Sequence, residues 1–125
     1  MIKLVFSLRR REDMTREEFQ RYWREDHAPL VQRHADALRI RRYVQTHARD
    51  TGLDEAITAP RGSEPHFYDG VAELWWDSLD DLLAAFTSEA GRVAGQELLE
   101  DERRFIDLPR SPAWLGEENV VIDLT

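Results

Sequence analysis

The sequence predicts an α+β fold in which a four-stranded antiparallel sheet carries its helices on one face. Short runs with apolar residues at every second position are typical of strands, and longer stretches with apolar residues every three or four positions are typical of helices. These patterns follow the order strand–helix–strand, loop, strand–helix–strand. That order is the split βαβ, or ferredoxin-like, arrangement, and we expect residues 1–125 to form it as a single domain.

Four segments have the composition of strands. The first covers residues 2–8, where the apolar side chains occupy alternate positions: Ile2, Leu4, Phe6 and Leu8. Residues 40–47 alternate more weakly, residues 68–76 alternate most clearly, and residues 119–124 form a short last strand. We therefore expect these four segments to pair as one sheet.

The first helical region begins at a clear signal. Thr15 and Glu18 have the spacing of a capping box, in which each side chain bonds the backbone of the other residue. Pro29 interrupts the helical pattern because it has no N–H and crowds the preceding turn. We expect one helix to end near Asp26 and a second to run from there to about Leu38.

The second half of the chain has a similar plan. Ser78 has the chemistry of a helix cap, and another helical stretch extends from about Glu89 to Arg104. Between the halves, residues 49–66 form a long connection that contains Gly52, Pro60, Gly62 and Pro65. Connections of this length are usually functional, so we expect this one to border a ligand pocket.

A chain of this size has too few elements to cover both faces of its sheet. With the helices on one face, we expect Val5, Tyr43, Val71 and Trp75 on the other. An apolar sheet face without a cover needs a partner. The sequence therefore predicts a homodimer that packs sheet against sheet.

Composition excludes several classes of function. The chain has 17 Lys and Arg against 25 Asp and Glu, a net charge of −8, so we expect no nucleic-acid partner. Cysteine is absent, which excludes disulfides and thiolate metal sites. No apolar run is long enough for a membrane span, and the N-terminus lacks the pattern of a signal peptide, so we expect a cytoplasmic protein. The four histidines have no metal-binding spacing, and no metal site is expected: His27, His34, His47 and His66.

His27 is the first candidate for catalysis. It lies on the apolar side of the first helical region, one turn after Trp23 and next to the break at Pro29. An imidazole in such a place can be adjusted to act as a general acid or base near neutral pH. The alternative interpretation is a histidine that only bonds a free carbonyl at the break.

Other residues are candidates for substrate binding. Phe19 and Trp23 are candidate apolar walls, and Tyr68 stands beside Asp69 after the long loop, although Asp69-Gly70 is also an ordinary turn signal. Polar or aromatic residues that share a strand face are candidates for a cavity or for the dimer interface: Tyr43, His47, Glu73 and Trp75.

Three separated motifs in this chain resemble those of the EthD family. The motifs are Phe19-x-x-Tyr22-Trp23-x-x-x-His27-Ala28-Pro29-Leu30-Val31, Asp69-Gly70-Val71-Ala72-Glu73-Leu74-Trp75-Trp76, and Asp101-Glu102-x-x-Phe105-Ile106-Asp107. The resemblance implies a dimeric α+β barrel and puts the family's motif histidine at His27. The family takes its name from a protein associated with a haem monooxygenase system for ether breakdown. Related members resemble dehydratases, and wider relatives on the same fold include cyclases, lactone isomerases and cofactor-free oxygenases.

Residues and resemblance together favour a cofactor-independent enzyme of the lyase or isomerase kind. Its substrate would be a small, partly apolar carbonyl or aromatic compound, and His27 would move a proton next to the carbonyl. Two alternatives stay open at this point. One is a ligand-binding or accessory protein without catalysis, with an oxygenase system as its partner, and the other is a cofactor-free oxygenase.

Overall fold

The computed structural model describes residues 1–125 and has a single four-stranded sheet. Its strands are β1 (Ile2–Leu8), β2 (Arg42–His47), β3 (Gly70–Trp76) and β4 (Ala113–Gly116). They lie in the order β2-β3-β1-β4, and all neighbours are antiparallel. This arrangement confirms the ferredoxin-like fold predicted from the sequence.

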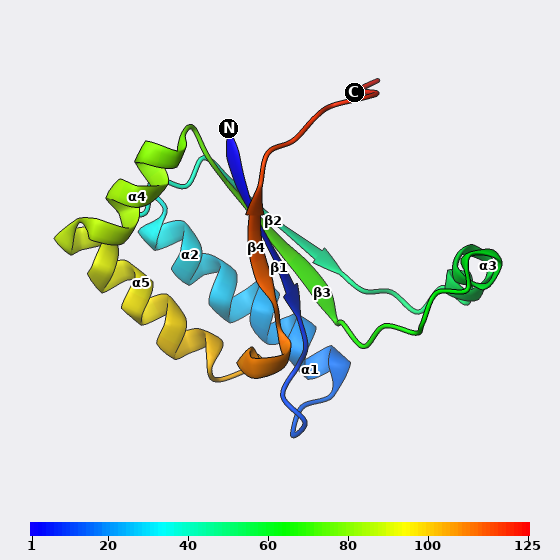
Figure 1. The fold of residues 1–125 in the computed structure, drawn as a ribbon. Coiled ribbons are helices and arrows are strands. Elements are labelled where there is room, and N and C mark those ends of the chain that lie inside the picture. Colours follow the sequence, from blue (N-terminus) through cyan, green and yellow to red (C-terminus); the bar gives the residue numbers. More distant parts are fainter.

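The long helices all lie on one side of the sheet (Figure 1). They are α1 (Arg16–Tyr22), α2 (Ala28–His34), α4 (Leu79–Thr87) and α5 (Glu89–Glu102). The connection between β2 and β3 contains the short helix α3 (Asp54–Thr58) and a 3₁₀ turn (Ala59–Arg61), which project away from the body. A second 3₁₀ turn (Leu108–Arg110) precedes β4. No helix is both long enough and apolar enough to cross a lipid bilayer.

The first helical region is continuous, whereas the sequence predicted a break near Asp26. A π-helical turn at Trp23–His27 joins α1 to α2, and the N–H of Ala28 donates to the carbonyl of Trp23, five residues earlier. Pro29 lies in the first turn of α2, where its missing N–H costs little. The wider turn therefore accommodates the proline without ending the helix.

The last strand is not where the alternation predicted it. The partner of β1 is Ala113–Gly116, and residues 119–124 are an irregular tail that extends from the body (Figure 1). Arg10 bridges Ile106 at the end of β1, and the N–H of Ser7 donates to the carbonyl of Pro112. The chain after α5 therefore already runs beside β1, and β4 pairs with the free edge of β1. No edge of β1 is left for residues 119–124.

The cross-strand register decides which residues face the helices, because residues directly opposite each other share a face. Tyr43 is opposite Leu74, and Leu74 is opposite Leu4, so all three point toward the helices. The prediction that Tyr43 lies on the open face was therefore wrong. Alternation within one strand separates two faces but does not tell which of them meets the helices.

The open face carries a mixed row across all four strands: Val44, Glu73, Val5 and Trp114. Glu73 forms an ion pair with Lys3 on this face. Trp75 is nevertheless buried, because Lys3 and Arg42 lie over its ring and its indole N–H donates to Glu118.

The main core joins the helix-facing side of the sheet to α1 and to the end of α5. Its fully buried members include Phe19, Trp23 and Phe105, and the Phe19 ring centroid lies 5.6 Å from that of Trp23 and 5.4 Å from that of Phe105. A second cluster joins α2, α4 and α5 through Val31, Ala85 and other buried apolar residues: Leu38, Ala94 and Leu98.

Helices α4 and α5 meet at a sharp bend at Ser88, which ends the first helix and caps the second. The bend brings the backbone of Ala85 against Gly91, so a Cβ at position 91 would overlap the carbonyl oxygen of Ala85. Gly95, one turn further along α5, has no neighbouring atom within 4 Å of its would-be Cβ. Only the first of the two glycines is required by packing.

We therefore predict opposite effects of the same substitution at these two sites. Gly91→Ala should lower the free energy of unfolding by about 1–3 kcal/mol, the usual cost of an overpacked site. Gly95→Ala should raise it by up to about 1 kcal/mol, since alanine favours the helix over glycine. Urea unfolding followed by circular dichroism measures both, and equal stabilities would contradict the close approach of α4 to α5.

Candidate functional site

A cavity of about 340 Å³ lies between the helices and the covered face of the sheet. Of its 18 lining residues, 15 are hydrophobic, so its walls are almost entirely apolar. The exceptions are Gly95 and two titratable side chains, His27 and Glu102. A mainly apolar pocket with a few converging polar groups is the usual form of a small-molecule site.

His27 reaches the cavity from the π-helical turn, and its imidazole is buried. Its Nδ1 lies 2.7 Å from a carboxylate oxygen of Asp101 on α5. Because an ionised carboxylate only accepts hydrogen bonds, Nδ1 carries the proton and Nε2 is left with its lone pair. Nε2 has no hydrogen-bond partner within the protein, so it is the nitrogen available to a ligand.

Asp101 is buried and accepts three hydrogen bonds. Tyr22 donates its O–H, Arg104 donates from 2.9 Å, and His27 donates its Nδ1–H. Burial by itself would raise the pKa of Asp101, but the donors Tyr22, His27 and Arg104 outweigh it and hold the pKa below its usual value. The carboxylate is thus charged at neutral pH and fixes the orientation of the imidazole.

The same environment keeps His27 neutral. Burial lowers the pKa of His27 below its ordinary value of 6.5, and it outweighs the opposing effect of Asp101, which favours the protonated ring. At neutral pH the cavity therefore contains an unprotonated Nε2 backed by a carboxylate, which is the arrangement of a general base.

Glu102 follows Asp101 in the chain and also lines the cavity. Burial and, to a smaller extent, the charge of Asp101 raise its pKa to about 7 against the opposing effect of Arg103. Its carboxyl forms no hydrogen bond or ion pair in the protein. Near pH 7 a large fraction of Glu102 is protonated, so this side chain can donate a proton where His27 accepts one.

Tyr43 supplies the third polar group. Its hydroxyl accepts hydrogen bonds from the indole N–H of Trp23 at 3.1 Å and from the side-chain amide of Gln45 at 2.9 Å. With both of these partners donating, the O–H proton of Tyr43 is free for an oxygen atom of a ligand. Burial raises the pKa of Tyr43, which keeps this proton in place.

His47 does not line the cavity but contacts two residues next to it, Gln45 and Trp23. Its Nε2–H donates to the side-chain oxygen of Gln45 at 2.8 Å, and its ring centroid lies 4.4 Å from that of Trp23. The amide of Gln45 then points its N–H groups at Tyr43 and at the carbonyl of Trp23. The Nδ1 of His47 is buried without a partner.

The residues singled out in the sequence thus separate into three sets. His27, Trp23 and Tyr43 line the cavity, whereas Phe19 and His47 stand behind its wall. The remaining three lie elsewhere: Tyr68 stacks on His66 before β3, and Glu73 and Trp75 are on the open face of the sheet. The long connection before β3 contributes no residue to this cavity; its last residue, His66, instead lines a separate polar hollow at the start of β3.

Asp101 and Glu102 stand in the third family motif, but neither they nor Gln45 were predicted as site residues from the sequence. One signal for Asp101 was present, because it falls between Leu98 and Phe105 on the apolar side of α5, three and four residues from them. A lone acid on such a face needs a hydrogen-bond partner, and so does the buried imidazole of His27 on the facing helical region.

The contact between the two side chains can be tested by titration. Asp101→Asn keeps an oxygen that can accept from Nδ1–H but removes the charge that favours protonation, so the pKa of His27 should fall further below 6.5. Two-dimensional NMR of the imidazole nitrogens measures this pKa. Glu97→Gln, which removes the partner of His34, should leave His27 unchanged. An equal or higher pKa of His27 in Asp101→Asn would contradict the contact.

Comparisons with known proteins agree with this fold. The model of the EthD domain matches residues 11–109. An EthD family protein from Bacillus halodurans is 19% identical, with a TM-score of 0.63 and 95% of this chain and 99% of that chain covered. An EthD-like protein from Ralstonia eutropha is 17% identical, with a TM-score of 0.55 and coverage of 98% and 93%. A dimeric ferredoxin-like protein of unknown function from Thermobifida fusca is 16% identical, with a TM-score of 0.54 and coverage of 92% and 88%.

No curated protein matches the chain. The structural likenesses are at low identity and concern the fold, whereas the match to the family model extends over most of the sequence. The chain belongs to the EthD family.

Proposed function

We propose that the apolar cavity is the active site of an enzyme of the lyase or isomerase kind, which moves protons at a carbon next to a carbonyl group. The observation that carries the proposal is the hydrogen bond of 2.7 Å from the Nδ1 of His27 to Asp101. It leaves an unprotonated Nε2 in an apolar cavity, and a site that only binds apolar molecules has no use for a base.

The cavity limits the class of substrate. Its volume of about 340 Å³ is near the lower end of the range for ligand sites, about 300–1,000 Å³. Aromatic side chains form much of its wall, among them Trp23, Trp76 and Phe86. These features favour a small, mainly apolar or aromatic molecule with one or two oxygen functions.

Each polar group then has one task. Nε2 of His27 takes a proton from the carbon next to the carbonyl, and Asp101 stabilises the resulting imidazolium. Tyr43 donates its O–H to the carbonyl oxygen, which gains negative charge as the enolate forms. Protonated Glu102 returns a proton, either to a leaving hydroxyl, which departs as water, or to a second carbon, which completes an isomerisation.

Proton abstraction can be measured without the natural substrate. The protein should catalyse exchange of hydrogen for deuterium next to the carbonyl of small ketones such as acetophenone in D₂O, followed by NMR. His27→Gln should reduce this rate by about two to four orders of magnitude, the usual contribution of a general base. His34→Gln serves as the matched control and should exchange at the wild-type rate, because His34 pairs with Glu97 outside the cavity.

Two results would decide against this function. Ketones that quench the tryptophan fluorescence of the protein without any exchange would favour a ligand-binding or accessory protein. Exchange that is equal in His27→Gln and the wild type would remove His27 from the reaction.

The open face of the sheet supports a second part of the proposal, a homodimer packed face to face. Val44, Val5 and Trp114 lie on this face around the ion pair of Glu73 and Lys3. The tail that leaves beside the face exposes further apolar residues: Val120, Val121, Ile122 and Leu124. The structural relative from Thermobifida fusca is described as dimeric. We therefore expect a second copy of this chain to cover the open face of the sheet.

We expect light scattering at micromolar concentration to give about twice the chain mass of 14.7 kDa. Val5→Glu puts a carboxylate opposite Glu73 in the centre of the face and should yield a monomer. Val93→Glu makes the same change on the exposed side of α5 and should stay dimeric. A wild-type monomer, or a dimeric Val5→Glu variant, would contradict this assembly.

A further inference from the structure

A second hollow, of about 430 Å³, lies at the corner where β1 ends and β3 begins. It shares no residue with the apolar cavity and has the opposite character, since only one of its eight lining residues is hydrophobic. Four arginines and two acids line it together with His66 and Phe67: Arg9, Arg10, Arg11, Arg16, Glu12 and Asp69. Positive charge therefore collects here in a chain whose net charge is −8.

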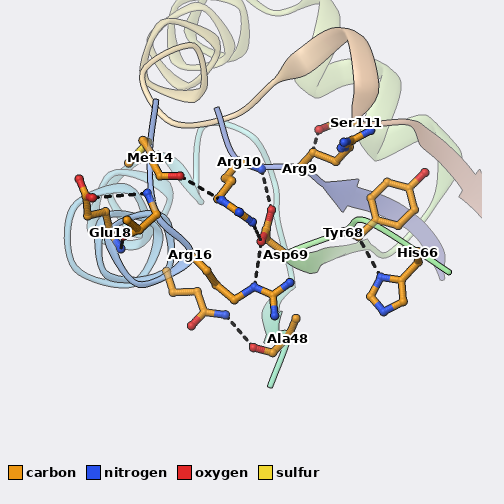
Figure 2. Close-up of polar contacts among 12 residues, drawn as sticks. Arg9, Arg10, Met14, Arg16, Glu18, Ala48, His66, Tyr68, Asp69 and Ser111 are labelled. Carbon is orange, nitrogen blue, oxygen red and sulfur yellow. Dashed lines mark hydrogen bonds and ion pairs between the residues drawn. The ribbon is translucent and has the colours of Figure 1, made fainter. Parts of the chain in front are cut away.

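Asp69 organises this corner. Its side chain is 1% exposed, and Figure 2 shows Arg10 and Arg16 pointing toward it. One carboxylate oxygen accepts from the backbone N–H of Arg10 at 2.9 Å, and the other accepts from the guanidinium groups of Arg10 at 2.6 Å and Arg16 at 3.0 Å. Burial would raise the pKa of Asp69, but these hydrogen bonds outweigh it and hold the pKa below its usual value. Asp69 is thus a buried anion that is already held by three hydrogen bonds inside the protein.

The arginines, in contrast, keep free donors. Arg10 also donates its Nε–H to the carbonyl of Met14, which fixes its guanidinium and leaves its Nη2 group without a partner. Arg16 uses only its Nε–H, so both of its Nη groups are free. Arg9 makes no side-chain hydrogen bond, and its guanidinium lies over the ring of Phe67 at 5.3 Å.

The charges do not cancel within the hollow. Arg11 pairs with Asp13, and Glu12 pairs with Arg110. Arg9, Arg10 and Arg16 remain, and they have one carboxylate among them, that of Asp69. Two positive charges are therefore left over next to donors whose geometry is already fixed.

We propose that Arg9, Arg10 and Arg16 form a binding site for the oxyanion group of a small metabolite, a phosphate ester or a carboxylate. The planar fork of a guanidinium matches the paired oxygens of both groups. Because Asp69 and Met14 already hold the guanidinium groups of Arg10 and Arg16, little side-chain freedom is lost when the anion binds. The site is independent of the catalytic proposal, since it uses none of the residues of the apolar cavity.

The test is a titration with inorganic phosphate, and separately with acetate, at constant ionic strength maintained with NaCl. Saturable shifts of the backbone amide signals of Arg10 and Asp69 in ¹H–¹⁵N NMR report binding. Arg16→Gln should weaken it by about tenfold, the scale of one charge-assisted hydrogen bond. Arg21→Gln removes a charge from an exposed position of the same helix and should bind as the wild type does.

Arg9→Gln is the second variant. The side chain of Arg9 makes no hydrogen bond and its backbone hydrogen bonds stay in the variant, so Arg9→Gln should keep the fold and still weaken binding. Saturation by phosphate alone assigns the site to phosphate esters, and saturation by both anions shows that it accepts carboxylates. Shifts no larger than those caused by NaCl, or equal affinities of Arg9→Gln, Arg16→Gln and the wild type, would overturn the proposal. His27→Gln should bind phosphate normally, whatever its effect on proton exchange.

Discussion

The hydrogen bonds to Asp101 connect the two halves of this fold. Asp101 comes from α5, in the second half of the chain, while Tyr22 and His27 come from the first helical region. A buried carboxylate is tolerated only when its lone pairs are satisfied, so the three donors must converge on it. Their convergence aligns α5 with the π-helical turn and at the same time sets the tautomer of His27. The packing of the helices and the chemistry of the cavity thus depend on the same carboxylate.

Asp69, directly before β3, is a second buried carboxylate that organises its surroundings, with a different result. Both acids are buried and ionised, but Asp101 accepts from a histidine and a tyrosine, whereas Asp69 accepts mainly from two arginines. The first arrangement leaves a lone pair free on His27, and the second leaves N–H groups free on Arg10 and Arg16. Asp101 therefore orients a base, His27, in an apolar cavity, whereas Asp69 orients hydrogen-bond donors of Arg10 and Arg16 in a polar hollow.

The two faces of the sheet also differ in chemical character. Helix-facing residues enclose the cavity, and among them Tyr43 contributes a polar group because its register puts it opposite Leu74. The open face combines aliphatic residues with the ion pair of Lys3 and Glu73. An internal ion pair of this kind lets a polar face pack against another protein surface without an unpaired charge.

Local signals in the sequence were sufficient for the elements that depend on neighbouring residues. Strand β1, the capping box of Thr15 and Glu18, and the Ser78 cap of α4 all follow from side chains within a few positions of one another, and the structure has each of them. Membership of the EthD family could also be identified from the sequence, because the family motifs are local runs of residues.

Tertiary structure alone decided the features that depend on distant residues. The alternation of residues 119–124 is typical of a strand, but the pairing of Arg10 with Ile106 assigns the edge of β1 to Ala113–Gly116 instead. Asp69-Gly70 has the pattern of a turn, but Asp69 is a buried acid whose partners, Arg16 and Arg10, lie 53 and 59 residues earlier. His27 stood out in the sequence because of its place beside Pro29, yet its partner Asp101 is 74 residues away. Sequence patterns record the preferences of adjacent residues, whereas the partner of a buried charge is set by which helices and strands pack together.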